Sequence, residues 1–168
     1  MFGLTTLGVF HTAISLVALI AGIIAFARYK EISSKNLLGQ VFLAGTIVSC
    51  LTGFGIFQHG GFGKPHVLGI MTLVVLAAAL TAEYSSLLGR ASRYVATLGY
   101  STAFFFHFVP ATAETLTRLP PGAPIAPNAD APQVQMVIGG FFVLYLIGIT
   151  LQVLRMRAAR PAQLGSAT

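Results

Sequence analysis

Long apolar runs separated by short polar segments make up most of the chain. Five runs can be placed, at about residues 2–27, 37–58, 66–88, 94–113 and 133–154. At about 1.5 Å per helical residue, a run of about 20 residues crosses a hydrocarbon core about 30 Å thick. Glycine and proline occur in most of the connecting segments, as expected where helices stop. The pattern predicts an all-α membrane protein folded as a five-span transmembrane helical bundle.

The polar connections are too short to fold by themselves, so we predict one transmembrane helical domain over residues 1–168. The first run differs from a cleavable signal peptide, because such a peptide begins with positive charge. Here no Lys or Arg precedes Arg28, and the charges follow the apolar run. We therefore expect the first run to stay in the protein as a membrane anchor.

The composition supports a membrane location. Hydrophobic residues make up 55% of the chain and charged residues 8%, with a mean hydropathy of +0.82. A soluble domain needs far more charge on its surface. The basic pI near 10.0 does not indicate a nucleic-acid partner, because Lys and Arg lie at the ends of the apolar runs and not in one patch. The expected partner is the lipid bilayer.

The basic residues also predict the orientation. Cytoplasmic connections of membrane proteins are enriched in Lys and Arg. Lys64 and Arg118 fall on one side of the predicted bundle, and the other basic residues fall on the opposite side. We therefore expect an outside N-terminus, a cytoplasmic C-terminus and a multi-pass location in the inner membrane of a bacterial cell. The residues on the predicted cytoplasmic side are Arg28, Lys30, Lys35, Arg90, Arg93, Arg155, Arg157 and Arg160.

This topology places all four histidines in the outer half of the membrane. His59 ends the second run and His66 opens the third, so both lie at the outer interface. His11 lies about 10–14 Å below that interface and His107 about 9 Å below it, at the rise of an α-helix. An imidazole turned to lipid would lose its hydrogen bonds, at a cost of about 1–3 kcal/mol. We expect His11 and His107 to face the interior and to share a ligand, a water or a hydrogen bond.

Both deep histidines share a helix face with small residues. Stripes of small residues allow membrane helices to approach closely. Similar stripes occur in the second run and, in part, in the fifth, so we expect all of them to line helix contacts. The stripes are His11, Ser15, Ala18 and Gly22; Gly45, Ser49 and Gly53; Gly99, Ala103, His107 and Ala111; and Gly140, Leu144 and Gly148.

Histidine clusters of this kind favour one of two alternative cofactors, haem b or a transition metal. Haem b needs two histidines on different helices at one depth, a pattern that His11 and His107 meet. A transition metal such as zinc or copper would gather more ligands. Glu114 lies about two turns after His107 and could orient a ligand or accept a proton. The candidate metal ligands are His11, His59, His66, His107 and Glu114.

These residues predict a membrane protein that binds haem b or a transition metal near the outer face, with electron transfer as the associated role. The alternative is a non-catalytic accessory or assembly subunit of a larger membrane complex with no cofactor, in which each histidine is a hydrogen-bonded link between helices. Motifs for phosphate-binding loops, dinucleotides and zinc proteases do not occur. A single cysteine, Cys50, excludes an intrachain disulfide framework.

Three segments, NLLGQVFLAGTIVSCLTGFGIF, KPHVLGIMTLVVL and AETLTRLP, resemble an uncharacterised bacterial family of small multi-span membrane proteins. The resemblance covers about residues 5–120. It implies that His11, His66, Glu114 and Arg118 are motif positions, and it implies no activity. The sequence departs from the family pattern at Asn36 and Leu37, where a histidine and a basic residue would be expected.

Overall fold

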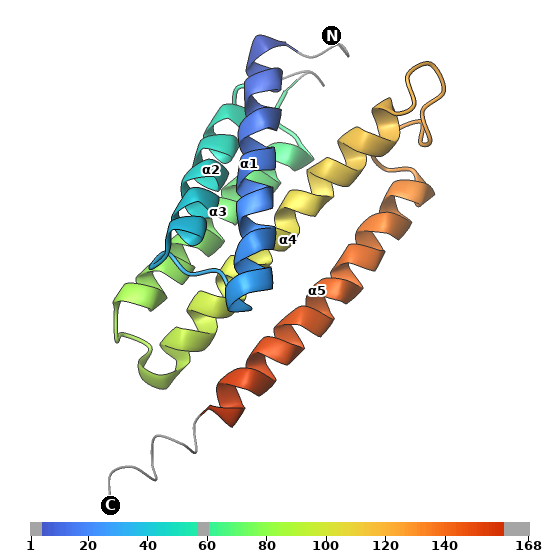
Figure 1. The fold of residues 1–168 in the computed structure, drawn as a ribbon. Helices are drawn as coiled ribbons and strands as arrows, with labels where there is room; N and C mark the ends of the chain where they lie inside the picture. Colours follow the sequence, from blue (N-terminus) through green and yellow to red (C-terminus); the bar gives the residue numbers. More distant parts are fainter. Residues whose placement is uncertain (1–4, 57–60, 160–168) are drawn as a thin grey trace, which may run out of the picture.

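The computed structural model describes residues 5–56 and 61–159, of which most are helical and none lies in a strand (Figure 1). The all-α class is thereby confirmed. Three of the helices are long and apolar enough to cross a membrane, namely α1, α3 and α5. The elements are α1 (Thr6–Tyr29), α2 (Leu37–Gly53), α3 (Lys64–Tyr84), the 3-10 helix η1 (Gly89–Ala91), α4 (Ser92–Arg118) and α5 (Pro132–Ala158).

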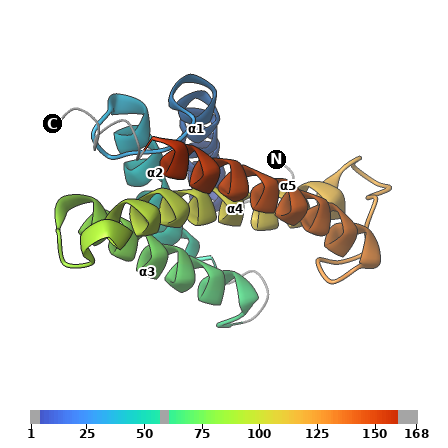
Figure 2. The same cartoon turned by 90° about the horizontal axis from the view of Figure 1, so that it is seen from below.

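Helix α4 lies between α5 and the other helices. Helix α1 packs chiefly on α2, and α3 packs chiefly on α4. Helix α5 packs on α4 and runs beside it, and the view in Figure 2 shows α4 between α3 and α5. The main core lies among α1 to α4, where the largest fully buried side chains include Tyr100, Phe42 and Leu76. The α4 chain continues as one helix through Pro110.

Small residues bring the first four helices together. A Cβ built on Gly45 would lie 2.9 Å from the Cβ of Ala18, and one built on Gly99 would lie 2.8 Å from the Cβ of Ala79. Gly22 is equally close to the ring of Phe104, at 2.7 Å. These distances leave no room for a larger side chain, so the glycines on α1, α2 and α4 line helix contacts as the sequence predicted.

The stripe on α5 lines no contact with another described helix, so within residues 5–56 and 61–159 the sequence prediction was wrong. A Cβ built on Gly140 or Gly148 meets no atom within 4 Å, and Leu144 is 62% exposed. Helix α5 contacts α4 through aromatic side chains on another face, with the rings of Phe108 and Phe141 4.5 Å apart. In the most apolar stretch of α5, 6% of the residues are buried in the described structure.

The helix ends differ from the apolar runs. Helix α3 ends at Tyr84 and not at residue 88, and α2 ends at Gly53, where the N–H of Phe54 donates to the carbonyl of Cys50. Helix α4 continues past residue 113 to Arg118, because the ion pair of Glu114 with Arg118 fits one helical turn. The predicted run ends at residues 2 and 58, and the basic residue Arg160, lie outside the described residues.

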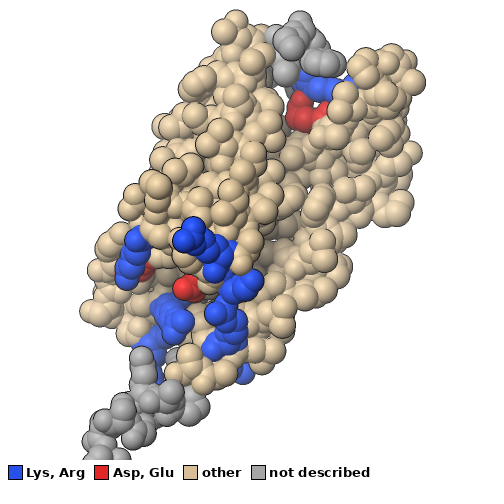
Figure 3. Space-filling view, viewed as in Figure 1, with Lys and Arg blue, Asp and Glu red and all other residues tan. Residues whose placement is uncertain are grey.

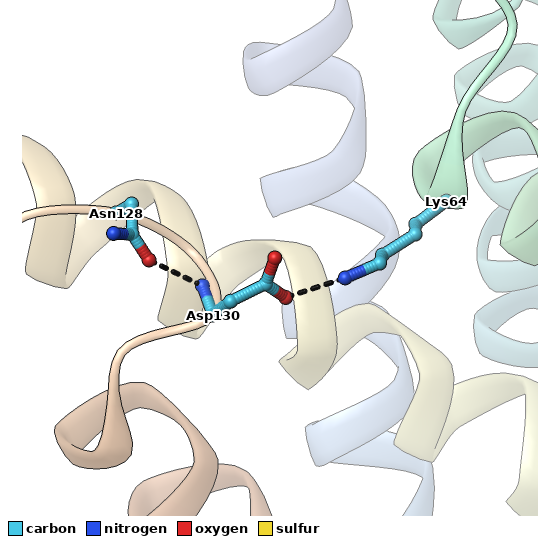
Figure 4. A network of polar contacts seen from close by, with 3 residues as sticks. All are labelled: Lys64, Asn128 and Asp130. Atoms are coloured by element: carbon cyan, nitrogen blue, oxygen red, sulfur yellow. Dashed lines mark hydrogen bonds and ion pairs between the residues drawn. The ribbon is translucent and has the colours of Figure 1, made fainter.

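An ion pair links the start of α3 to the connection between α4 and α5. Lys64 Nζ lies 2.6 Å from Asp130 Oδ1, and the N–H of Asp130 donates to the side-chain oxygen of Asn128 at 2.9 Å (Figure 4). The Lys64 and Asp130 side chains are 82% and 68% exposed. Exposed pairs of this kind contribute little to stability, so the pair mainly orients the connection.

Candidate functional site

His11 lies on α1 and bonds to α2. Its Nδ1 is 3.0 Å from the carbonyl oxygen of Ser49 and 3.1 Å from the hydroxyl of Thr52. A carbonyl oxygen only accepts, so Nδ1 must carry the proton and donate. The Thr52 hydroxyl donates its own proton to a backbone carbonyl of α2, which leaves its oxygen free to accept as well. The Nε2 atom of His11 therefore keeps its lone pair.

His107 lies on α4 and also bonds to α2, through the other ring nitrogen. Its Nε2 is 2.9 Å from the hydroxyl of Thr46, and that hydroxyl donates to the carbonyl of Phe42 at 2.7 Å. Because Thr46 has one proton and gives it to Phe42, Nε2 of His107 must be the donor. The Nδ1 atom of His107 keeps its lone pair, and no hydrogen bond from another described residue reaches it.

Both histidines use one face of α2. Thr46, Ser49 and Thr52 follow each other at intervals of three residues, and we refer to them as the α2 polar row. Ser15 of α1 contacts the same row, with its hydroxyl oxygen 2.5 Å from that of Ser49. His11 and His107 bond to different members of the row. The structure therefore brings the two residues to one surface of α2, where each has its own partner.

The other predicted ligands belong to local arrangements. His66 is buried at the start of α3, where its Nδ1 accepts from the N–H of Gly63 at 3.2 Å and its ring stacks on Phe62. Glu114 is 54% exposed and pairs with Arg118. His59 lies outside the described residues. Across residues 5–56 and 61–159, no group of three or more His, Cys, Asp or Glu side chains is placed to hold a metal ion.

A second polar site, which the sequence analysis did not identify, surrounds Glu83 at the end of α3. Its carboxylate accepts from the hydroxyls of Ser33 at 2.5 Å, Ser34 at 2.6 Å and Tyr100 at 2.6 Å, and from the N–H of Ser34 at 3.2 Å. Charge-assisted bonds of this kind are stronger than neutral ones. They tie the connection between α1 and α2 to α3 and α4. The sequence signal was available, because Glu83 is the one acidic residue within the five apolar runs.

No family model, curated protein or solved structure matches the chain. The resemblance carried by the three segments quoted above, and the motif positions it implies, therefore stay predictions.

Proposed function

We propose that the protein is a five-span protein of a bacterial inner membrane that binds a transition metal ion through His11 and His107 near the outer face. Three helices support the membrane assignment by length and composition. For the other two, α2 has 17 residues and α4 has 27, which at the rise of an α-helix reach about 25 Å and about 40 Å. The proposed orientation, with the C-terminus in the cytoplasm, rests on the distribution of Lys and Arg.

The observation that carries the metal proposal is the state of the two imidazole rings. Metal-binding histidines commonly donate one ring N–H to a carbonyl, carboxylate or water, which orients the other nitrogen as the ligand. His11 donates from Nδ1 to the Ser49 carbonyl, and His107 donates from Nε2 to the Thr46 hydroxyl. Each ring therefore offers one fixed lone pair. Solvent or a group outside the described residues would supply the remaining ligands of an ion held by two histidines.

Close contacts around these histidines favour a single ion over haem b in our proposal. The ring centroid of Phe42, which is fully buried, lies 5.7 Å from that of His107. On the α1 side, a Cβ built on Gly53 would meet Cε1 of His11 at 3.3 Å. A macrocycle bonded to both rings needs far more space beside them than a single ion does. A redox-active ion would supply one-electron chemistry there.

Metal analysis tests this proposal directly. The protein is purified from membranes in detergent without chelator, bound metals are measured by mass spectrometry, and Co²⁺ is titrated with absorbance as the readout. We expect bound metal and a cobalt spectrum that are lost in His11→Gln and in His107→Gln. The control His66→Gln should keep both. Equal metal content in all four proteins, or a Soret band in the absorbance spectrum, would contradict the proposal.

Reporter fusions test the proposed topology. A reporter that is active only in the cytoplasm, fused after Ala158, should be active, and the same reporter fused in the connection between α4 and α5 should be inactive. The reverse pattern would refute the orientation. Activity at both positions would refute the crossing of α5.

The second candidate function, an accessory or assembly subunit of a larger complex, is favoured by the exposed face of α5. Small residues in membranes allow close approach of another helix, and Gly139, Gly140 and Gly148 face open space. A partner helix packed there would cover this face. If so, a complex larger than one chain at native expression should dissociate in Gly140→Leu. A single chain of unchanged mass in both proteins would exclude this candidate.

A further inference from the structure

The ends of three helices enclose a polar hollow that the histidine site does not use. The end of α1, the start of α4 and the end of α5 line a hollow of about 110 Å³. The polar and charged residues that line it include Lys30, Glu31, Arg93, Thr97, Gln152 and Arg155. Figure 3 shows basic residues gathered at this end of the molecule, with acidic atoms among them.

The hollow has an excess of positive charge. Lys30, Arg93 and Arg155 contribute three cations, and Glu31 contributes one carboxylate, which lies 3.4 Å from the Thr97 hydroxyl. Lys30 Nζ donates to the carbonyl of Ala27. The ion pairs among the described residues lie elsewhere, so Arg93 and Arg155 have no carboxylate partner within that part of the chain. Arginine is well suited to bind phosphate oxygens in pairs.

A buried amide fixes the spacing of the three helices. Gln152 of α5 is 7% exposed, and its Nε2 donates to the carbonyl oxygen of Lys30 at 3.1 Å. Its Oε1 accepts from the hydroxyl of Ser101 on α4 at 2.8 Å. These bonds connect α5 to both α1 and α4 beside the hollow. The positions of the cations therefore depend on a held arrangement of helices and not on side chains projecting from one surface.

Exposed apolar side chains lie on the two helices whose ends line the hollow. On α1, Ile23 and Ile24 are 49% and 45% exposed, and on α5, Leu151 and Leu154 are 58% and 54% exposed. Figure 3 shows the surface hollowed between these two helices. A ligand with negative charge at one end and apolar chains next to it would match both features. Basic pockets between transmembrane helices bind anionic lipid headgroups in this way.

We propose that this hollow binds an anionic glycerophospholipid, with the phosphate between Arg93 and Arg155 and the acyl chains against α1 and α5. Arg93 and Arg155 come from helices that are far apart in the sequence, and the lipid would join them by charge. A phosphate ion shares the headgroup chemistry but lacks the acyl chains. The two ligands can therefore be distinguished by experiment.

The test compares lipid binding by matched charge variants. The full chain in neutral detergent is titrated with phosphatidylglycerol or with phosphatidylcholine, and bound lipid is counted by native mass spectrometry. We expect phosphatidylglycerol to bind at least about tenfold more tightly than phosphatidylcholine, and this preference to be lost in Arg93→Gln/Arg155→Gln, since each basic residue near an anionic lipid contributes roughly a fivefold effect. The control Arg90→Gln/Arg157→Gln removes equal charge outside the hollow and should keep the preference.

Further measurements distinguish an anionic lipid from a phosphate ion as the ligand of the hollow. Inorganic phosphate and glycerol phosphate at the lipid concentration should not displace phosphatidylglycerol, and displacement by either would overturn the lipid proposal. An equal loss in both double variants would assign the effect to general charge and refute the hollow. Should the double variant unfold in detergent, Arg155→Lys is used, which keeps the charge and removes the paired donors. Unchanged affinity in Arg155→Lys would also count against the proposed phosphate contact.

Discussion

Glycines on α2 and α4 lie against neighbouring helices, whereas glycines on α5 face open space. A Cβ built on Gly45 would lie 2.9 Å from the Ala18 Cβ, and one built on Gly99 would lie 2.8 Å from the Ala79 Cβ. A Cβ built on Gly140 meets no atom within 4 Å. One residue type therefore closes the contacts among the first four helices and leaves a surface of α5 uncovered.

The difference lies in which face of each helix meets a neighbour. Gly45 and Gly99 each meet an alanine, so both sides of the contact are small and the backbones can approach. Helix α5 instead meets a part of α4 rich in phenylalanine, where the rings of Phe105 and Tyr145 lie 5.1 Å apart. The glycines of α5 lie on another face of that helix, and a Cβ built on them meets no atom within 4 Å. A stripe of small residues thus predicts close packing only where that face meets another helix.

The largest effect should come from Gly39→Ala. A Cβ at Gly39 would lie 1.8 Å from the carbonyl oxygen of Ser33, so the connection between α1 and α2 would have to move. We expect a loss of about 3 kcal/mol or more in the free energy of unfolding, at the upper end for overpacking. Thermal or denaturant unfolding in detergent measures it. The control Gly139→Ala adds the same methyl in open space and should be nearly neutral. Equal losses of unfolding free energy in the two variants would contradict the difference between closely packed and open glycines.

Glu83→Gln should have the next largest effect. The glutamine amide has one carbonyl oxygen where the carboxylate accepts four hydrogen bonds, and its NH₂ group would face donors from Ser34 and Tyr100. We expect a loss of about 2–3 kcal/mol in the free energy of unfolding, because buried donors are left unsatisfied. The matched variant Asp130→Asn removes an exposed pair. A loss as large for Asp130→Asn would contradict this ranking.

Gly99→Ala should cost about 1–2 kcal/mol, since the new methyl overlaps the Ala79 side chain and part of the cost is offset by the better helix propensity of alanine. The double variant Gly99→Ala/Ala79→Gly restores the space. We expect it to recover most of the free energy of unfolding, which a double-mutant cycle would show. Additive losses in the double variant would mean that the two helices are not in contact there.

The smallest effect should come from Gly140→Ala. Its methyl has open space, so we expect a change within about 0.5 kcal/mol in the free energy of unfolding, or a slight gain from helix propensity. The variant is measured as the purified single chain. A clear loss there would show that α5 packs within the chain in a way that the structure does not contain.

The apolar pattern predicted the helices better than their ends. Helix α4 extends past residue 113 to Arg118. Thr117 and Arg118 belong to the helix but are polar, so the apolar run ends before them. Leu87 and Leu88 were included in the third run for their apolar character, yet they lie beyond the end of α3 and are 83% and 48% exposed. Local capping decides a helix end, and a hydropathy window does not detect it.

The sequence predicted which helix face His107 lies on, but it did not predict which residues contact His107 or Glu83. The stripe analysis placed His107 on an inward face, but its partner Thr46 lies 61 residues earlier in the chain. The four donors to Glu83 come from a connecting segment and from the next helix, which a pattern along one helix cannot reveal. Contacts between distant segments depend on how the helices pack together, and a single sequence does not show that packing.

In the proposed five-span topology, the Glu83 carboxylate has a consequence for how the chain would enter the membrane. Ser33 and Ser34 are synthesised before Glu83, but Tyr100 follows it by 17 residues. In that topology α3 would reach the membrane before Tyr100, one of the groups that bind its carboxylate. A partly satisfied carboxylate is costly in lipid, so α3 gains its full stability when α4 arrives. The two helices should therefore leave the insertion machinery as a pair, and a chain truncated before Tyr100 should be recognised by quality control as unfinished.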